Sequence, residues 1–491
     1  MEKEGAIERF RRAIRIRTDW PENVRGDNPS AEALEAAEGP LRAFQDFLDK
    51  AYPCFSRVAE RRVLSPYSLV YRWPGGASSE DSGGKEGQKT ADAPEPEGVL
   101  ILAHYDVVPV EADKWSTDPF GAEVKEGFMY GRGTQDMKGS LIAVMEAAEE
   151  LVIRGFRPRQ DIWFAFGGDE ERSGLQGARN TAAWFAGSGR SQGCGQGRRF
   201  SWVLDEGSSV TINQIRGIST PLALFGIEEK GFLSLELAVD QKPGHSSRPP
   251  RVQAAVLLAR ALLRISRRPF PARLSPVVAA LFSLLAGVRS RERGGALRPR
   301  AVAFRTRLLN ILAPLAAPIL TFTFRRDPQF LALLHTTVAM TQLEGSAADN
   351  VMPSRVRAVI NLRLLAPWTV DDAINYITWA VGDERVKLRI LGSAFPPVPA
   401  CPEHGRMAGP GWDTMTKAAA AVFPDAIPLP FIMTAATDSR HYRDLAGGIF
   451  RFSPMRLSPA DMSSVHGHDE RISLENFFLA IRFYTALFEL L

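Results

Sequence analysis

The sequence predicts an α/β protein with a mostly parallel sheet, into which a smaller α+β domain is inserted. Between residues 99 and 208, short apolar runs alternate with a helix-periodic segment, which is typical of parallel strands covered by helices. Between residues 232 and 395 the order becomes strand, helix, two strands, helix, strand, the pattern of a ferredoxin-like domain. The α/β character then returns. We therefore expect a large domain made of residues 1–222 and 397–491, and a small domain made of residues 223–396.

The elements of the large domain are predicted from their periodicity. Residues 1–20 place apolar side chains on one helical face, with Arg and Glu between them. The run VLILAHYDVV at 99–108 is short, apolar and β-branched, which indicates a buried strand. Residues 140–155 have helical periodicity and end in a glycine suited to a C-cap. Two further apolar strands, 161–171 and 200–208, stop in acidic residues.

The small domain is predicted from alternating strands and amphipathic helices. Its strands are expected at 232–241, 335–345, 355–365 and 386–395, and its helices at 252–265 and 370–381. An extra stretch at 270–326 is apolar and rich in arginine. Its most apolar parts, 276–288 and 308–324, are shorter than the ~20 residues that a membrane span needs and contain proline. We therefore expect no stable membrane span.

Composition excludes several classes of protein. With 45% hydrophobic and 24% charged residues, the chain has the composition of a globular protein. A net charge of +4 on 491 residues is close to neutral, so we expect no nucleic-acid partner. The cysteines, Cys54, Cys194 and Cys401, form no CxxC pair, which fits a reducing compartment. The first helix lacks an uninterrupted apolar core and carries acidic residues, so we expect neither a signal peptide nor a transit peptide. The expected location is therefore cytoplasmic. Two polar stretches, 75–98 and 187–199, are expected to be solvated loops.

Acidic and histidine side chains collect at the ends of the predicted strands. In open α/β sheets, functional groups gather beyond the carboxyl ends of the strands. His104 and Asp106 are two residues apart and therefore project to the same side. The other residues at such positions are Asp136 in a Gly-rich loop, the pairs Glu170–Glu171 and Asp205–Glu206, and His466 and His468 near the C-terminus.

So many carboxylates in one crevice are costly unless positive charge lies among them. Oxygen and imidazole ligands without thiolates suit zinc, manganese or cobalt. Two divalent ions ~3.5–4 Å apart would accommodate the whole set, because their four positive charges balance Asp136, Glu171, Asp205 and one hydroxide. Glu170 is then not needed as a ligand and is free to accept a proton from the bound water. The sequence therefore predicts a two-metal hydrolytic site, most simply with zinc.

These residues resemble a known family, the co-catalytic dizinc metallopeptidases of family twenty, which includes aminoacylase, glutamate carboxypeptidase and carboxypeptidase S. The resemblance extends from about His104 to the C-terminus and is closest to the carboxypeptidase S and N-acyl-amino-acid hydrolase branch. It implies a dizinc exopeptidase-like catalytic domain with an inserted lid. The motifs that carry it, in order, are AHYDVVPV, YGRGTQDMKG, DEE, VLDEG, GHSSRPP, DNVMPS, TDSR and VHGHDE.

The resemblance also implies roles for individual residues. His104 and Asp205 would hold one metal, Glu171 and His466 the other, and Asp136 would bridge them. Glu170 would be the general base. Asp106 would orient His104. In the lid, His245 would polarise the scissile carbonyl and Asn350 would contact the substrate, while Arg440 would bind the substrate's free carboxylate. His468 lies so near His466 that the choice of ligand between them stays open.

The expected function is hydrolysis of the amide bond of N-acyl amino acids or short peptides that have a free carboxylate. An aminopeptidase or another deacylase of the same family is one alternative, although Arg440 argues against a free-amine substrate. A non-catalytic metal-binding relative is the other. A homodimer through the lid is a further expectation. For the 270–326 stretch we favour a pocket for a long acyl chain, with a peripheral membrane contact and packing on the lid's own helices as alternatives.

Overall fold

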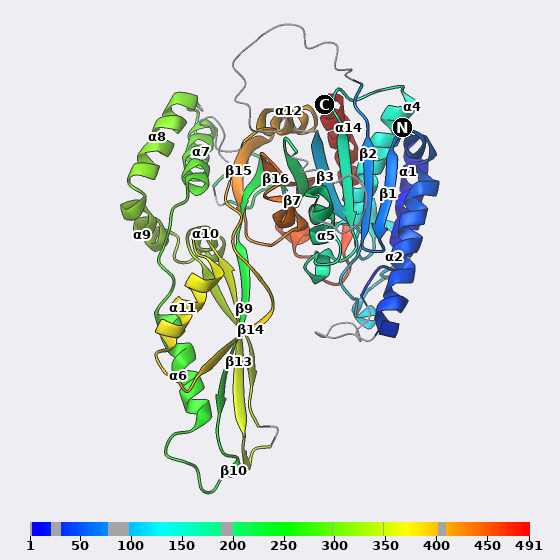
Figure 1. Ribbon diagram of the computed structural model, residues 1–491. Helices are drawn as coiled ribbons and strands as arrows, with labels where there is room; N and C mark the ends of the chain where they lie inside the picture. Colours follow the sequence, from blue (N-terminus) through cyan, green and yellow to red (C-terminus); the bar gives the residue numbers. More distant parts are fainter. Residues whose placement is uncertain are drawn as a thin grey trace.

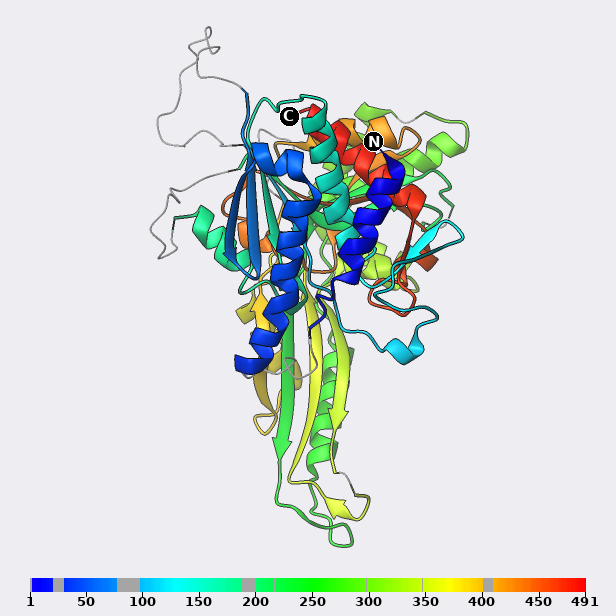
Figure 2. The same cartoon turned by 90° about the vertical axis from the view of Figure 1, so that its right-hand side faces the viewer.

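The computed structural model describes residues 2–20, 31–76, 98–187, 200–215, 217–296, 298–346, 348–400 and 409–491. The two stretches expected to be solvated loops lie almost wholly outside these residues, as do Cys194 and Cys401. Figure 1 shows a large α/β domain that contains both termini and a narrow domain that extends away from it. In the perpendicular view the small domain is a long arm below the large one (Figure 2). The chain therefore has the two-part architecture that the sequence predicts.

The large domain is built on an eight-stranded sheet with the order β1-β2-β6-β3-β7-β16-β8-β15. Its central neighbours β6, β3, β7 and β16 run parallel, while β1 and β2 add an antiparallel edge. At the other edge β15 is parallel to β8. The strands are β1 (Glu60–Ser65), β2 (Ser68–Trp73), β3 (Val99–His104), β6 (Ile162–Gly167), β7 (Val203–Thr211), β8 (Leu222–Glu229), β15 (Ile427–Met433) and β16 (Ile449–Leu457).

Helices cover both faces of this sheet because its central strands are apolar on both sides. On β3, Ile101 and Ala103 belong to the main core, whereas Leu100 and Leu102 belong to a second core on the opposite face, as the two-residue period of a strand requires. The main core is covered by α1 (Lys3–Arg15), α2 (Ala31–Ala51), α3 (Pro53–Val58), α4 (Lys138–Ile153), α12 (Trp412–Val422) and α14 (Leu474–Glu489), and the second by α5 (Ala178–Phe185). This arrangement leaves the ends of the strands as the accessible edge.

The small domain is a four-stranded antiparallel sheet with the order β11-β13-β9-β14. Two helices pack on one face and share a separate hydrophobic core with it. Because the chain order is strand, helix, two strands, helix, strand, the topology is ferredoxin-like. The elements are β9 (Gly231–Asp240), α6 (Ala254–Arg267), β11 (Thr337–Glu344), β13 (Arg355–Leu364), α11 (Val370–Val381) and β14 (Lys387–Phe395).

Shorter elements complete the chain near the domain ends. A small sheet has the order β17-β5-β4, and a two-stranded ribbon is formed by β10 and β12. These strands and the remaining short helix are β4 (Glu123–Lys125), β5 (Phe128–Tyr130), β10 (Gly244–His245), β12 (Val351–Met352), β17 (Arg471–Ser473) and α13 (Pro459–Met462).

The first boundary between the domains lies later than residue 223, where the sequence placed it. β8 pairs with β15 and β7 in the large sheet, and only Lys230 separates it from β9 of the small sheet. The charged residues Glu228, Glu229 and Lys230 interrupt the apolar pattern between the two strands, and the chain changes sheet at this interruption, after β8 rather than before it.

The stretch at 270–326 packs on the large domain, which corrects the expectation that it would pack on the lid's helices or form part of the lid. It contains three helices, α7 (Pro276–Glu292), α8 (Pro299–Ile311) and α9 (Ala313–Thr323), and α10 (Pro328–Leu334) follows it. Val277, Val278 and Leu281 of α7 join the main core of the large domain. The Glu292 carboxylate accepts hydrogen bonds from Ser219 and Thr220 of the large domain.

No single helix among the described residues is long and apolar enough to cross a membrane. Taken together, α8 and α9 reach the required length and apolar character, but the chain bends by 100° between them.

The chain crosses between the two domains at four places, and hydrogen bonds join these crossings. Glu229 and Val398 exchange two backbone hydrogen bonds of 2.9 Å, which pairs the first crossing with the last. The Lys230 ammonium donates to the carbonyl oxygens of Ala332 and His335 at 2.9 and 2.7 Å. His335 Nδ1 lies 2.9 Å from the Phe270 carbonyl oxygen. The crossings near residues 230, 271, 336 and 397 therefore form one connected junction.

A buried ion pair beside this junction gives a stability prediction. Arg451 Nε lies 2.6 Å from Glu229 Oε2, and both side chains are almost completely buried. Arg451→Met leaves the Glu229 carboxylate without its counter-charge, and we expect it to reduce the free energy of unfolding by about 3–5 kcal/mol. Urea denaturation followed by tryptophan fluorescence measures this.

The matched control lies on the same strand. Arg456 pairs with the half-exposed Asp425, so Arg456→Met is expected to cost less than ~1 kcal/mol. Equal losses in the two variants would contradict the special role of the buried pair.

Candidate active site

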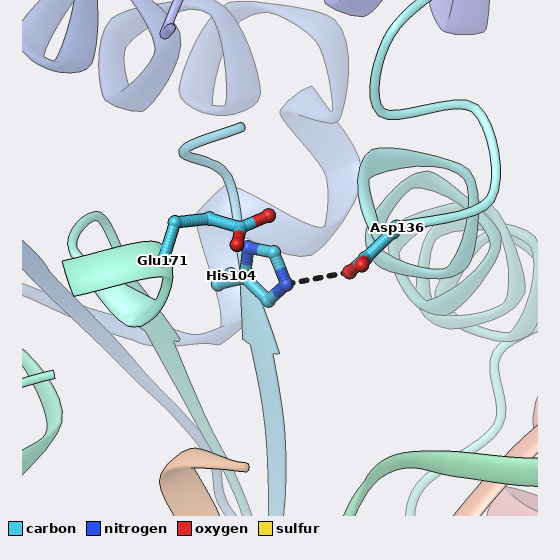
Figure 3. Close-up of side chains that lie close together, drawn as sticks. All are labelled: His104, Asp136 and Glu171. Atoms are coloured by element: carbon cyan, nitrogen blue, oxygen red, sulfur yellow. Dashed lines mark hydrogen bonds and ion pairs between the residues drawn. The ribbon is translucent and has the colours of Figure 1, made fainter. Parts of the chain in front are cut away.

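The strand ends of the large domain bring acidic and histidine side chains into one cluster. Figure 3 shows His104, at the end of β3, facing Asp136 and lying beside Glu171. Asp136 lies in the loop before α4, and Glu171 follows β6. The ligand atoms of these three residues lie within 4.8 Å of one another, as do those of a second group, His104, Glu170 and Glu206. Each group could hold a metal ion, and they share His104.

Asp136 lies between two histidines. Its Oδ1 is 3.0 Å from His104 Nε2 and its Oδ2 is 2.9 Å from His466 Nε2. The same His466 nitrogen is 3.3 Å from Glu171 Oε1. A carboxylate that offers one oxygen to each side is suited to bridge two metal ions.

Asp106 organises the residues around it. His104 Nδ1 lies 3.0 Å from the Asp106 carbonyl oxygen and 3.4 Å from its carboxylate, which directs His104 Nε2 towards the cluster. The completely buried Asp106 carboxylate also accepts hydrogen bonds of 3.1 Å from the backbone N–H groups of Glu170 and Glu171. Asp106 therefore fixes the end of β3 and the segment after β6 relative to each other.

The structure brings Glu206, and not Asp205, to His104. Glu206 Oε1 is 3.3 Å from His104 Nε2, whereas the two Asp205 oxygens accept hydrogen bonds from the backbone N–H groups of Glu206 and Ser439. The register between β7 and β16 shifts at this point, because Asp205 and Ser208 pair with consecutive residues of β16. Such an irregularity reorients side chains, and the carboxylate that lies beside His104 is that of Glu206 and not that of Asp205.

The two histidines near the C-terminus have different surroundings. His466 joins the cluster, while the exposed His468 lies with its Nε2 3.2 Å from the exposed Glu111 carboxylate. His466 has a positive φ of 60°, an uncommon conformation for a residue other than glycine. The structure thus favours His466 as the ligand.

Sequence reasoning did not single out Glu470, which holds the loop that carries Asp136. The fully buried Glu470 carboxylate accepts hydrogen bonds from the backbone N–H groups of Gly133, Gln135 and Asp136 and pairs with Arg132 at 2.8 Å. Because Glu470 lies four residues after His466, it ties the Asp136 loop to the His466 segment. Its position at the end of the VHGHDE motif was the available signal.

The charges of the cluster fit a pair of divalent cations. Burial raises the pKa of Glu206 well above its ordinary value, and the charge of Asp136 adds to this. Glu171 Oε1 is buried, and its only cationic contact among the described residues is His466 Nε2 at 3.3 Å. The nearby cation Lys138 is directed elsewhere, since its ammonium donates to the carbonyl oxygens of Ala13 and Ile16. Carboxylates and imidazoles without a thiolate are the ligand set of hydrolytic zinc, manganese or cobalt sites.

The histidines show the same excess of negative charge. Burial disfavours the charged form of His104, but Glu206, Asp106 and Asp136 outweigh it and raise its pKa well above the ordinary value. Hydrogen bonds to Asp136 and Glu171 raise the pKa of His466 to about 10. A bound metal ion would take the place of these protons.

Glu170 lies in the cluster, in the group that it forms with His104 and Glu206. Burial raises the pKa of Glu170 well above its ordinary value, and the charges of Glu206 and Asp438 reinforce the effect. A carboxylate with a raised pKa is a better proton acceptor from water than an ordinary one.

A cleft of about 850 Å³ opens beside Glu171. It lies between the two domains, because β14 of the small domain contributes one wall. Its lining residues are Trp20, Val108, Pro109, Glu171, Arg172, Ser173, Leu175, Arg179, Gly392, Ser393, Ala394, Phe395, Arg440 and His441. None of them comes from 270–326, so the acyl pocket expected from that stretch is not part of this cleft.

Arg440 is held firmly at the cleft. Its guanidinium lies over the Phe395 ring, 4.6 Å from the centroid. Nη1 donates to the Thr437 carbonyl oxygen and Nη2 to that of Ser173, and the buried Nε has no hydrogen-bond partner. Together with Arg172 and Arg179 it gives the cleft a positive lining, which suits an anionic group.

His245 and Asn350 lie together but away from the cluster. His245 of β10 pairs with Val351 of β12, and the Asn350 carbonyl oxygen accepts a hydrogen bond from Ser246 N. Figure 1 shows β10 at the end of the small domain farthest from the large sheet. Within one chain in this conformation, these two residues do not meet the metal-binding cluster.

The fold and the cluster define a two-metal hydrolase built on an α/β domain with an inserted ferredoxin-like domain. Residues 100–490 match peptidase family M20/M25/M40. The chain therefore belongs to this family of dimetal metallopeptidases and is a metal-dependent hydrolase, as the sequence resemblance predicts.

Two relatives and one solved structure illustrate the match. The chain is 31% identical over 456 residues to the probable carboxypeptidase S-like 2 of Dictyostelium discoideum, covering 92% of this chain and 80% of that protein. It is 30% identical over 446 residues to the N-fatty-acyl-amino acid synthase/hydrolase PM20D1 of Mus musculus, covering 90% and 81%. The M20 family metallo-carboxypeptidase of Sulfolobus solfataricus shares the fold, with a TM-score of 0.64 at 14% identity over 100% of this chain and 99% of that one.

Substitutions of the two neighbouring carboxylates of β7 are expected to differ in their effect on metal content. Glu206→Gln removes a charged ligand atom beside His104, so we expect it to lower the bound metal from about two ions per chain to about one. Asp205→Asn keeps an acceptor for a backbone N–H, so we expect it to stay near the wild-type value. Elemental analysis of the purified variants measures both. The reverse order would restore Asp205 as the ligand.

Proposed function

We propose that the protein hydrolyses the amide bond of N-acyl amino acids, or of short peptides, that carry a free carboxylate. One observation carries this proposal: Glu171 of the carboxylate–histidine cluster also lines a cleft that contains Arg172, Arg179 and Arg440. A scissile amide at the cluster would place a carboxylate of the same molecule near these arginines. The guanidinium group is suited to bidentate recognition of a carboxylate.

We propose zinc as the metal in both positions, with cobalt and manganese as alternatives. His104 and Glu206 would hold one ion, His466 and Glu171 the other, and Asp136 would bridge them. Bound there, the ions would supply an activated water and a Lewis acid for the carbonyl oxygen.

The chain's own residues would then carry the proton. Glu170 accepts a proton from the attacking water and passes it to the leaving amine nitrogen. Asp106 keeps Glu170 in place, because its carboxylate binds the Glu170 backbone N–H, and it also keeps His104 in the orientation that offers Nε2 to the metal. Arg440, fixed by two backbone carbonyls, aligns the substrate with little loss of side-chain entropy.

The acyl group is proposed from the relatives. One of them is named as an N-fatty-acyl-amino acid synthase/hydrolase, and another as a carboxypeptidase S-like protein. We therefore place N-acyl amino acids first and short peptides second. A free-amine substrate is disfavoured, because the three arginines of the cleft would repel an ammonium group.

The test of the general base is a substrate panel with a matched variant. We expect the wild type to hydrolyse N-acyl amino acids in the presence of zinc, cobalt or manganese and to hydrolyse the corresponding amino-acid amides poorly. Glu170→Gln should lower kcat by ~10²–10⁴-fold, the contribution of a general base, while its metal content stays close to that of the wild type. A near-wild-type rate in this variant, or equal rates on acids and amides, would contradict the proposal.

We further propose a homodimer through the small domain. The support is the position of His245, an exposed histidine on the distant ribbon in a segment that resembles a substrate-contacting motif. A second chain, or a closing movement of the small domain, could bring His245 to a cluster from which it is remote. In either case its imidazole would polarise the scissile carbonyl, and Asn350 on the same ribbon would contact the substrate.

Complementation distinguishes these two possibilities. Glu170→Gln and His245→Ala are each expected to have low activity alone. If His245 serves the partner's cluster, co-expressing the two variants should restore activity, because one site of each mixed dimer then has both groups intact. Co-expressing Glu170→Gln with Glu206→Gln is the control without recovery, since every cluster is then defective. Recovery absent from both pairs would contradict the dimeric arrangement and favour closure within one chain.

A further inference from the structure

Helices α8 and α9 expose an unusual amount of apolar surface. Within the described part of the chain, seven large apolar side chains are more than 60% exposed, and five of them lie between residues 304 and 322. They are Phe304, Ile311, Leu315, Ile319 and Phe322, with exposed fractions of 66–68%. Exposed apolar residues scattered singly are normal, but a contiguous group marks an interaction surface.

The exposed side chains form one outward stripe on each helix. Phe304, Leu308 and Ile311 on α8 are spaced at i, i+4 and i+7, which places them on one helical face. Leu315, Ile319 and Phe322 repeat the same spacing on α9. We call these six residues the apolar ridge.

The ridge faces away from the protein. On α9, the opposite face contributes Ala316, Ala317 and Leu320 to the packing against the main core. Figure 1 shows α8 on the far side of α7 from β15, at the outer edge of the molecule. Both helices are thus held by the large domain on one side and present the ridge on the other.

The segment that carries the ridge is basic along its sequence. Between Glu292 and Asp327 the sequence contains no acidic residue and seven arginines: Arg293, Arg298, Arg300, Arg305, Arg307, Arg325 and Arg326. No described carboxylate forms an ion pair with any of these arginines. A partner for this surface must therefore combine apolar and anionic groups.

We propose that the apolar ridge docks the protein on an anionic lipid bilayer, with both helices lying in the interface. The helices have 13 and 11 residues, which at 1.5 Å per residue gives roughly 20 and 17 Å, well below the ~30 Å hydrocarbon core. The 100° bend between them divides them into two short helices instead of one straight one. An interfacial helix buries its apolar face at the acyl boundary while Arg side chains meet the headgroups.

A second copy of the chain fits this surface less well. In a two-fold symmetric contact the same patch meets itself, so the seven arginines of one chain would face seven of the other without an acidic residue between them. Charge complementarity therefore selects the lipid surface, and this inference does not depend on the proposed substrate.

Vesicle flotation tests the proposal with the full-length chain. We expect the wild type to float with vesicles of phosphatidylcholine and phosphatidylglycerol, and much less with phosphatidylcholine alone or at high salt, because the arginine contribution is screened. The combined variant Phe304→Ser/Ile311→Ser/Ile319→Ser/Phe322→Ser should stay with the unbound protein. Its hydrolytic rate on a water-soluble substrate and its circular dichroism should match the wild type, since none of these residues lines the cleft.

The control variant carries equally exposed apolar residues outside the ridge. Ile153→Ser/Leu343→Ser removes side chains that are 67% and 68% exposed and should float like the wild type. Flotation of the ridge variant with anionic vesicles, or no flotation of the wild type, would overturn the proposal. It would also be overturned if sedimentation showed a dimer that only the ridge variant dissociates, with vesicle binding unchanged.

Discussion

The structure of this protein is organised around a concentration of negative charge that its own cations do not neutralise. Asp136, Glu170, Glu171 and Glu206 converge at one edge of the large sheet, and the nearby Lys138 is directed into backbone carbonyls instead. The buried carboxylates of Asp106 and Glu470 accept hydrogen bonds from backbone N–H groups of the converging segments. They thereby position the segments that carry the cluster residues. Such an assembly is costly unless protons or cations lie among the carboxylates, so we expect metal binding to stabilise the folded chain.

Features that repeat along the chain were predictable from the sequence. The order of elements in the small domain follows from periodicity, because each strand alternates and each helix is amphipathic, and the observed sheet order is the ferredoxin-like one. The central parallel strands follow from short apolar runs such as β3. The residues His104, Glu170 and Glu171 were found because each lies where such a run stops, and parallel strands bring these ends to one edge. Asp136 was found from the Gly-rich loop that leads into a helix.

Features that depend on a local irregularity or on tertiary contact were not predictable. The shift of register in β7 exchanges the expected positions of Asp205 and Glu206, and periodicity contains no signal for such a shift. His466 and His468 are distinguished by tertiary contacts, because His466 meets Asp136 and Glu171 whereas His468 pairs with Glu111. The partner of the stretch at 270–326 could not be read from its composition, because apolar helices pack equally well on either domain. His245 was identified by its motif, but the length of the small domain sets its distance from the carboxylate–histidine cluster.

The joined crossings between the domains restrict how the small domain can move. Two independent linkers would let the small domain rotate in any direction. Here hydrogen bonds of Glu229, Lys230 and His335 connect the four crossing segments to one another. We expect a junction of this kind to permit bending about one axis and to resist twisting. The cleft, whose far wall is β14, would then open and close along a single coordinate. The ribbon of β10 and β12 would then move a long way, because a small rotation at the junction is multiplied by the length of the small domain.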